Sequence, residues 1–155
     1  MLRSAMRTRF FIPALFVALL AAPALAQDEA PTLVFVVHGL RNDTGYVAGG
    51  IYADPRVWTH EGGQVATCRA PIREGTARCV IRAPGPGRYA FAFLHDEDGN
   101  GRMHTDGLGL PQEGYGFGHD ARGTLGAPSF ESASYLLTTG QRVESTLTVR
   151  YGLGL

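Results

Sequence analysis

The chain has 155 residues, with 14 basic and 14 acidic side chains and a formal net charge of zero when histidine is neutral. Every basic residue is an arginine, and three arginines lie in the first 26 residues, so residues 27–155 carry a net charge of −3. A slightly acidic chain disfavours nucleic acid or an anionic lipid surface as a partner. Its 129 residues suit one domain with one core and are too few for two.

The N-terminal segment has the pattern of a secretory signal peptide. Its arginines precede an apolar run over residues 10–22, and Ala24-Leu25-Ala26 supplies the small-x-small pattern of a signal-peptidase site. The run is shorter than the ~20 residues that cross a bilayer, and no cysteine follows to carry a lipid anchor. We expect residues 1–26 to be cleaved, residues 27–155 to form one domain without a transmembrane segment, and a periplasmic or secreted location.

Alternation of apolar and polar residues predicts an all-β domain. Residues 143–151 show one apolar and one polar face, whereas residues 32–40 and 88–95 are apolar on both faces and read as central strands. No stretch after residue 26 has the period of an amphipathic helix. We predict a single antiparallel β-sandwich of about seven strands, immunoglobulin- or transthyretin-like, with one long glycine-rich loop over residues 96–131. The other expected strands cover residues 45–53, 64–70, 77–82 and 132–138.

Cys68 and Cys79 are the only cysteines. In an exported chain two cysteines are expected to pair, because the compartment is oxidising. Their spacing does not fit a Cys-x-x-Cys redox motif, and two thiolates alone cannot complete a zinc site. We therefore predict a structural disulfide.

Residues 95–118, HDEDGNGRMHTDGLGLPQEGYGFG, concentrate acidic residues and glycines in the predicted loop. Its start, Asp96-x-Asp98-x-Asn100-Gly101, places oxygen ligands on alternate residues before a glycine, as calcium-binding loops do. An EF-hand would need glutamate at Gly107 and flanking helices, and the sequence offers neither. The predicted Ca²⁺ ligands are Asp96, Asp98, Asn100, the carbonyl of Arg102, and a closing carboxylate from Asp106 or Glu113.

Two other interpretations of this loop remain open. The acidic side chains can instead cap backbone amides in a series of Asx-turns, without any metal. Alternatively, His104 and His119 can join His95 in a transition-metal site, although their spacing matches no compact ligand motif. Otherwise we expect His95 to be buried and to donate to a loop carboxylate, and Tyr115 and Phe117 to brace the loop by packing on the end of the sandwich.

A set of short motifs resembles a known bacterial family. Tyr89-Ala90, His95-Asp96, Asn100-Gly101 and the run from Gly109 to Phe117 occur in the order and spacing of the secreted family called domain of unknown function 2141. The resemblance covers nearly all of residues 27–155 and implies a small exported β-sandwich, similar to transthyretin-like or carboxypeptidase regulatory-like domains, with no known substrate. The family pattern usually has aspartate at the position of His104, so this chain is expected to bind calcium more weakly or to prefer a softer metal.

These observations favour a non-catalytic binding or accessory module with a calcium-binding loop and a protein or glycan partner in the cell envelope. The chain lacks the Gly-x-Ser-x-Gly, His-Glu-x-x-His and phosphate-loop motifs. The alternative is a small hydrolase, or a transition-metal-binding protein, that uses the same loop. For a glycoside hydrolase, Asp96 or Asp98 would work with Glu113 as the pair of carboxyl groups.

Overall fold

The structure is a computed structural model that describes residues 29–124 and 126–152. These residues form an all-β domain with two 3₁₀ turns, η1 (Pro55–Val57) and η2 (Gly118–Asp120). The predicted signal peptide lies outside the described residues, and no helix within them is long and apolar enough to span a membrane. The strands are β1 (Thr32–His38), β2 (Tyr46–Tyr52), β3 (Ala66–Arg73), β4 (Thr76–Arg82), β5 (Gly87–Asp96), β6 (Gly114–Phe117), β7 (Ser134–Leu137) and β8 (Arg142–Thr148).

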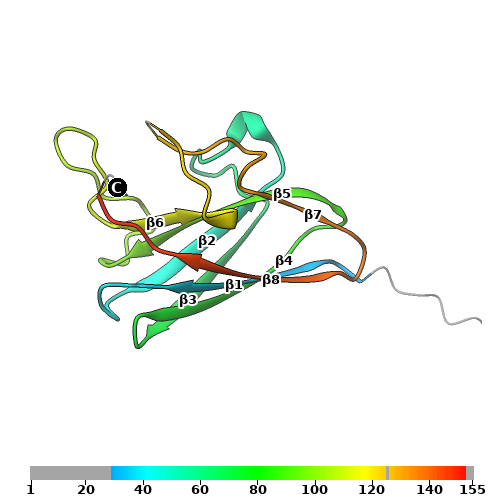
Figure 1. The fold of residues 1–155 in the computed structure, drawn as a ribbon, viewed down its shortest axis with the longest axis horizontal. Coiled ribbons are helices and arrows are strands. Elements are labelled where there is room, and N and C mark those ends of the chain that lie inside the picture. The colour runs from blue at the N-terminus through cyan, green and yellow to red at the C-terminus, as the bar shows by residue number, and fades with distance from the viewer. Residues whose placement is uncertain (1–28, 125, 153–155) are drawn as a thin grey trace, which may run out of the picture.

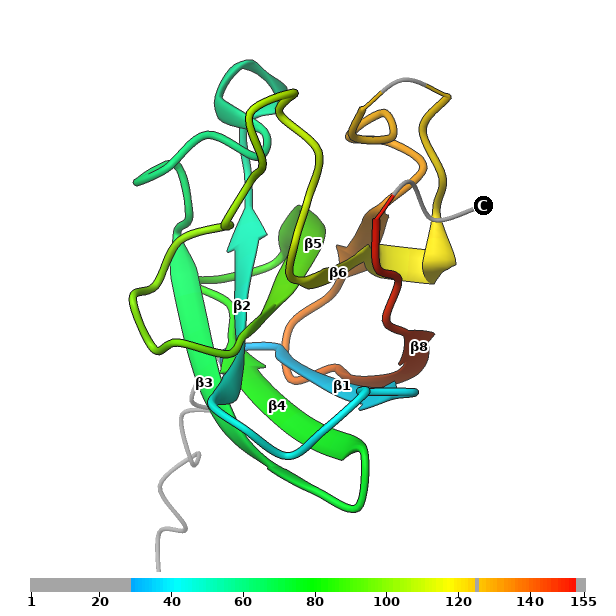
Figure 2. The ribbon, with the colours of Figure 1, turned by 90° about the vertical axis from the view of Figure 1, so that its left-hand side faces the viewer.

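The strands form one mixed sheet in the order β6-β5-β2-β3-β4-β1-β8, with β7 pairing beside β6 on the same edge of β5. The sheet curls around its core, so that its two ends approach each other (Figures 1 and 2). Just beyond β8, Arg150 exchanges two backbone hydrogen bonds of 2.8 Å with Tyr115 of β6. This bridge nearly closes the sheet into a barrel.

The seven predicted strands and the all-β class are confirmed, but the predicted pairing is wrong in one respect. β8 lies parallel to β1, with Thr32 opposite Arg142 and His38 opposite Thr148, so the sheet is not purely antiparallel. The predicted sandwich is not confirmed either, because the strands join in a single curled sheet instead of two separate ones.

The predicted long loop is interrupted by β6, a strand that the sequence analysis missed. Gly114 and Gly116 alternate with Tyr115 and Phe117, so the face of β6 that points toward the core carries no side chains. On β5, Phe93 lies directly opposite Gly116, and its ring fills the space above the glycine. The glycines therefore let the β6 backbone lie directly against core side chains.

We predict that Gly116→Ala destabilises the domain. A Cβ at this position would lie 2.5 Å from two atoms of the buried Phe93 ring, so the ring or the strand must move, at a cost of about 1 to 3 kcal/mol. The free energy of unfolding from denaturant titration measures this. Gly107→Ala is the matched control, because a Cβ there meets no atom within 4 Å. Equal stability of both variants would contradict the close packing of β6.

The interior of the curled sheet holds the main core, which is rich in aromatic and branched side chains. Phe35 of β1 and Phe91 of β5 stack at its centre, and both are fully buried.

The predicted disulfide is confirmed: Cys68 on β3 and Cys79 on β4 are bonded, with Cα atoms 5.8 Å apart. The β3–β4 ladder comprises two residue pairs, Ile72 with Ala77 and Arg73 with Thr76. The disulfide therefore joins the two strands where they diverge.

A second, smaller apolar cluster covers the outer face of the sheet near the end of β2. Trp58, just after η1, packs edge-on against Tyr52 and Phe130 and donates a hydrogen bond of 2.8 Å to the carbonyl of Pro128. This cluster fixes the loops around residues 53–65, 121–124 and 126–133 on the same side of the sheet as residues 97–113 (Figures 1 and 2).

Candidate functional site

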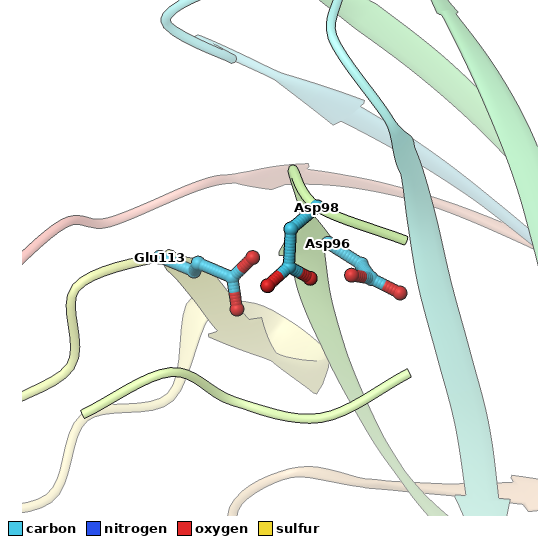
Figure 3. A group of neighbouring side chains, drawn as sticks. All are labelled: Asp96, Asp98 and Glu113. Carbon is cyan, nitrogen blue, oxygen red and sulfur yellow. The ribbon is translucent and has the colours of Figure 1, made fainter. Parts of the chain in front are cut away.

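The register between β5 and β6 brings the acidic residues of the loop together. His95 pairs with Gly114, so Asp96 at the end of β5 and Glu113 just before β6 lie side by side. Asp98 lies beside them, and ligand oxygens of Asp96, Asp98 and Glu113 lie within 4.8 Å of one another (Figure 3). Within the described residues, this is the one group of three or more histidine, cysteine or acidic side chains arranged closely enough to hold a metal ion.

Asp96 is fully buried and is held by backbone amides. Its two carboxylate oxygens accept hydrogen bonds from Gly99 N at 2.9 Å and Gly101 N at 2.8 Å. Burial opposes the charged form, but the Tyr46 hydroxyl beside it and these two amides favour that form more strongly, so the pKa of Asp96 is lowered. The Tyr46 hydroxyl is itself buried and makes no hydrogen bond of good geometry in the described structure, so we attribute the ordering of Asp96 to the amides.

Glu113 and Asp98 are ordered by the loop in a similar way. Glu113 is 4% exposed and accepts hydrogen bonds from Glu97 N at 2.9 Å and His104 N at 3.0 Å, so it ties both halves of the loop to β6. Asp98 is exposed and accepts from the backbone and side-chain amides of Asn100. These contacts are those expected of Asx-turn capping, and they leave further lone pairs on each carboxylate.

The remaining predicted ligands lie around this group. Asn100 and Arg102 follow Asp98 in the same turn, where Asn100 Oδ1 accepts from Arg102 N at 2.7 Å. His104 is exposed, with Nδ1 3.8 Å from Asp98 Oδ2. Asp106 is outside the group, because its Oδ1 caps Leu108 N and Leu110 N in a separate turn. Of the two closing carboxylates proposed from the sequence, the structure therefore brings Glu113 to the site.

The three loop histidines do not converge. His95 is fully buried, and its ring nitrogens contact the Tyr151 hydroxyl at 2.7 Å and the Thr44 carbonyl at 2.9 Å. Because a carbonyl can only accept, Nε2 carries the proton and Nδ1 faces the tyrosine. His119 lies on η2, stacked on Tyr135, with Nε2 3.1 Å from the carbonyl of Ser134.

Residues outside the loop also hold the site, and the sequence analysis missed them. Arg41 binds Glu97 through two hydrogen bonds of 2.6 and 2.5 Å, and this pairing lowers the pKa of Glu97. Tyr46 lies opposite Asp96 on β2. Arg41 and Tyr46 are far from the motif in sequence, and only the strand register places them there.

Tyr115 and Phe117, predicted to pack on the end of the domain, instead line the outer face of β6, partly buried and edge-on to each other.

Comparison with protein families finds a match. The chain matches, over residues 35–145, a family described as "Uncharacterized protein conserved in bacteria (DUF2141)". No curated protein and no solved structure matches the chain. The match therefore assigns a family and carries no activity, ligand or partner.

Proposed function

The chain belongs to the DUF2141 family of uncharacterised bacterial proteins, and from that premise we propose that it is a non-catalytic binding or accessory module of the cell envelope whose loop 97–113 is ordered by Ca²⁺. The proposed ion lies between Asp96, Asp98 and Glu113. Asn100, the carbonyl of Arg102 and His104 are the nearest candidates to complete its coordination. The signal-peptide pattern of residues 1–26 supports the proposed location.

The main observation in support of the metal proposal is that Glu113 lies beside Asp96 and Asp98. Three carboxylates within 4.8 Å repel one another, and no arginine in the described part of the chain forms an ion pair with any of them. A hard divalent cation offsets this repulsion and prefers oxygen ligands. The lowered pKa of Asp96 is compatible with this role, because a metal ligand must be deprotonated.

The hydrolase alternative gains no support from these carboxylates. A general acid needs a raised pKa, whereas the pKa of Asp96 is lowered. Backbone amides occupy both oxygens of Asp96, and such contacts favour the charged form of this carboxyl group. Turn capping without a metal remains the competing interpretation of the loop, and the following experiment separates it from calcium binding.

We predict that millimolar Ca²⁺ raises the melting temperature of the protein. The family resemblance implies aspartate at the position of His104, so we expect weak affinity, in the range ~10⁻⁴ to 10⁻³ M, and a rise on the order of 5 °C at saturating calcium. Differential scanning calorimetry with Ca²⁺ and with chelator measures it. His104→Asp should tighten binding, because it adds a negative charge beside Asp98.

Two matched substitutions test the ligand assignment. Glu113→Gln should abolish the calcium-dependent rise, whereas Asp106→Asn should keep it, because Asp106 caps a separate turn outside the group. The comparison is made within each variant, with and without calcium, so an intrinsic loss of stability in Glu113→Gln does not affect it. If calcium leaves the melting curves of wild type and His104→Asp unchanged, the metal proposal is wrong and the loop is held by turn capping alone.

A further inference from the structure

A groove of about 1140 Å³ runs along the outer face of the sheet beside the acidic group. Its floor consists of small residues on neighbouring strands, chiefly Ala48 and Gly50 of β2 and Ala92 of β5. Tyr115 and Phe117 of β6 form one side. The loop before β3 and the loop before β6 rise above the floor. Arg102 of the loop before β6 forms an ion pair with Glu61 of the loop before β3 at 3.2 Å. The walls of the groove are therefore formed by two loops that an ion pair joins.

The lining combines apolar, hydroxyl and amide groups with positive charge. Arg69 and Arg102 line the groove together with Glu61, while none of the three site carboxylates does. Arg102 already pairs with Glu61, whereas no carboxylate in the described structure forms an ion pair with Arg69. The guanidinium of Arg69 lies 4.0 Å above the ring of Tyr46. Stacking fixes the plane of the guanidinium and leaves its N–H groups available to an anion.

We propose that this groove binds an acidic oligosaccharide, with Arg69 pairing with a carboxylate of the sugar and Tyr115 and Phe117 contacting its apolar faces. Sugar rings carry apolar faces and hydroxyl edges, and the groove offers aromatic side chains together with Gln64, Thr67 and Thr59. An acyl chain in the groove would leave the hydroxyl and amide groups of the lining without hydrogen-bond partners from the ligand. This disfavours a lipid tail.

An extended peptide fits the groove less well than a sugar. Peptides that add to a sheet need an unpaired strand edge. At the groove floor β2 is paired with both β3 and β5, and β5 is paired with both β2 and β6, so the floor offers a face and no free edge. Because Arg102 is paired with Glu61, the guanidinium of Arg69, unpaired within the described residues, is the charge of the lining that favours an anionic ligand.

This inference rests on the proposed role as a binding module and names its ligand class, but it does not require the calcium ion. Loop 97–113 forms one wall of the groove, so an ion that orders the loop should strengthen sugar binding without being a condition for it. Binding is therefore measured both in chelator and in calcium, which keeps the two proposals separable.

The test uses isothermal titration calorimetry of the mature protein with tetragalacturonate, in chelator. We expect saturable binding with a dissociation constant below roughly 1 mM. The methyl ester of the same oligosaccharide, which lacks the negative charge, should bind about tenfold more weakly. Arg69→Gln should weaken binding of the acid to a similar extent, and Ala48→Phe, which fills the floor from the solvent side, should abolish it.

Controls separate the sugar assignment from general charge attraction. Arg82→Gln removes an exposed arginine on β4, away from the groove, and should leave binding unchanged. Melting curves show whether each variant is folded. The proposal is overturned if tetragalacturonate does not bind, if Arg69→Gln and Ala48→Phe bind it as wild type does, or if oligoglutamate of equal charge binds equally well. Sugar binding in chelator without a calcium-dependent melting shift would overturn the metal proposal alone.

Discussion

Val149→Asp is expected to unfold the domain. Val149 follows β8, is 6% exposed in the main core, and donates its backbone N–H to His38 O at 3.0 Å. An ionised aspartate there would be buried without a partner, at a cost of about 4 kcal/mol or more, which approaches the whole stability of many domains. Far-ultraviolet circular dichroism and denaturant titration measure the loss.

The control for this substitution lies three residues earlier, on β8. Thr146→Asp introduces the same side chain on the exposed face of β8, so its charge stays in water. It should leave the protein folded, with a loss of at most about 1 kcal/mol from reduced strand propensity. A folded Val149→Asp protein, or equal losses for both variants, would show that residues 147–149 do not close the core as described.

The second large effect is expected at Asp96→Asn. The asparagine keeps the size of the side chain but replaces one acceptor oxygen with an NH₂ group, which then faces the N–H of Gly99 or Gly101. We expect a loss of about 1 to 3 kcal/mol, concentrated in the loop. Limited proteolysis in chelator should therefore cleave residues 97–113 faster than in wild type. Asp106→Asn, in an exposed turn of the same loop, is the control and should have a smaller effect.

The same substitution should change the response to acid. The pKa of Asp96 is lowered in the folded state, so its ionisation stabilises the fold above the ordinary value of 3.8, and this contribution is lost as the pH falls through the lower folded-state value. Asp96→Asn lacks this contribution at every pH. Its free energy of unfolding should therefore vary less than that of wild type as the pH falls below 3.8. A parallel pH dependence in both proteins would contradict the described environment of Asp96.

The strands were predictable from sequence wherever side chains alternate. Residues 142–148 form a strand with Leu147 buried and Glu144 exposed, as the period-two pattern indicates. β6 was missed because its inward positions are Gly114 and Gly116, so it has no apolar residues on the core side to reveal the period. Its one readable signal was the alternation of Tyr115 and Phe117 with glycine.

The pairing of distant strands was not predictable, because alternation describes one strand at a time. Nothing in residues 142–148 shows that they align in parallel with residues 32–38. The same limit applied to the site. The spacing of Asp96 and Asp98 was readable, but the choice between Asp106 and Glu113 depends on the β5–β6 register. Arg41 and Tyr46 reach the site only through the arrangement of β2 and its preceding loop.

The parallel pairing of β1 and β8 also has a consequence for the order in which the fold can be completed. β1 is the first strand of the described chain and β8 the last, and in the native sheet β1 lies between β4 and β8. Closing so long a segment of chain makes folding slow compared with domains of local topology. Until the last strand is present, one edge of β1 has no partner and the core stays open. A chain that becomes available from its N-terminal side first therefore cannot complete the sheet until residues 142–148 are free to pair with β1.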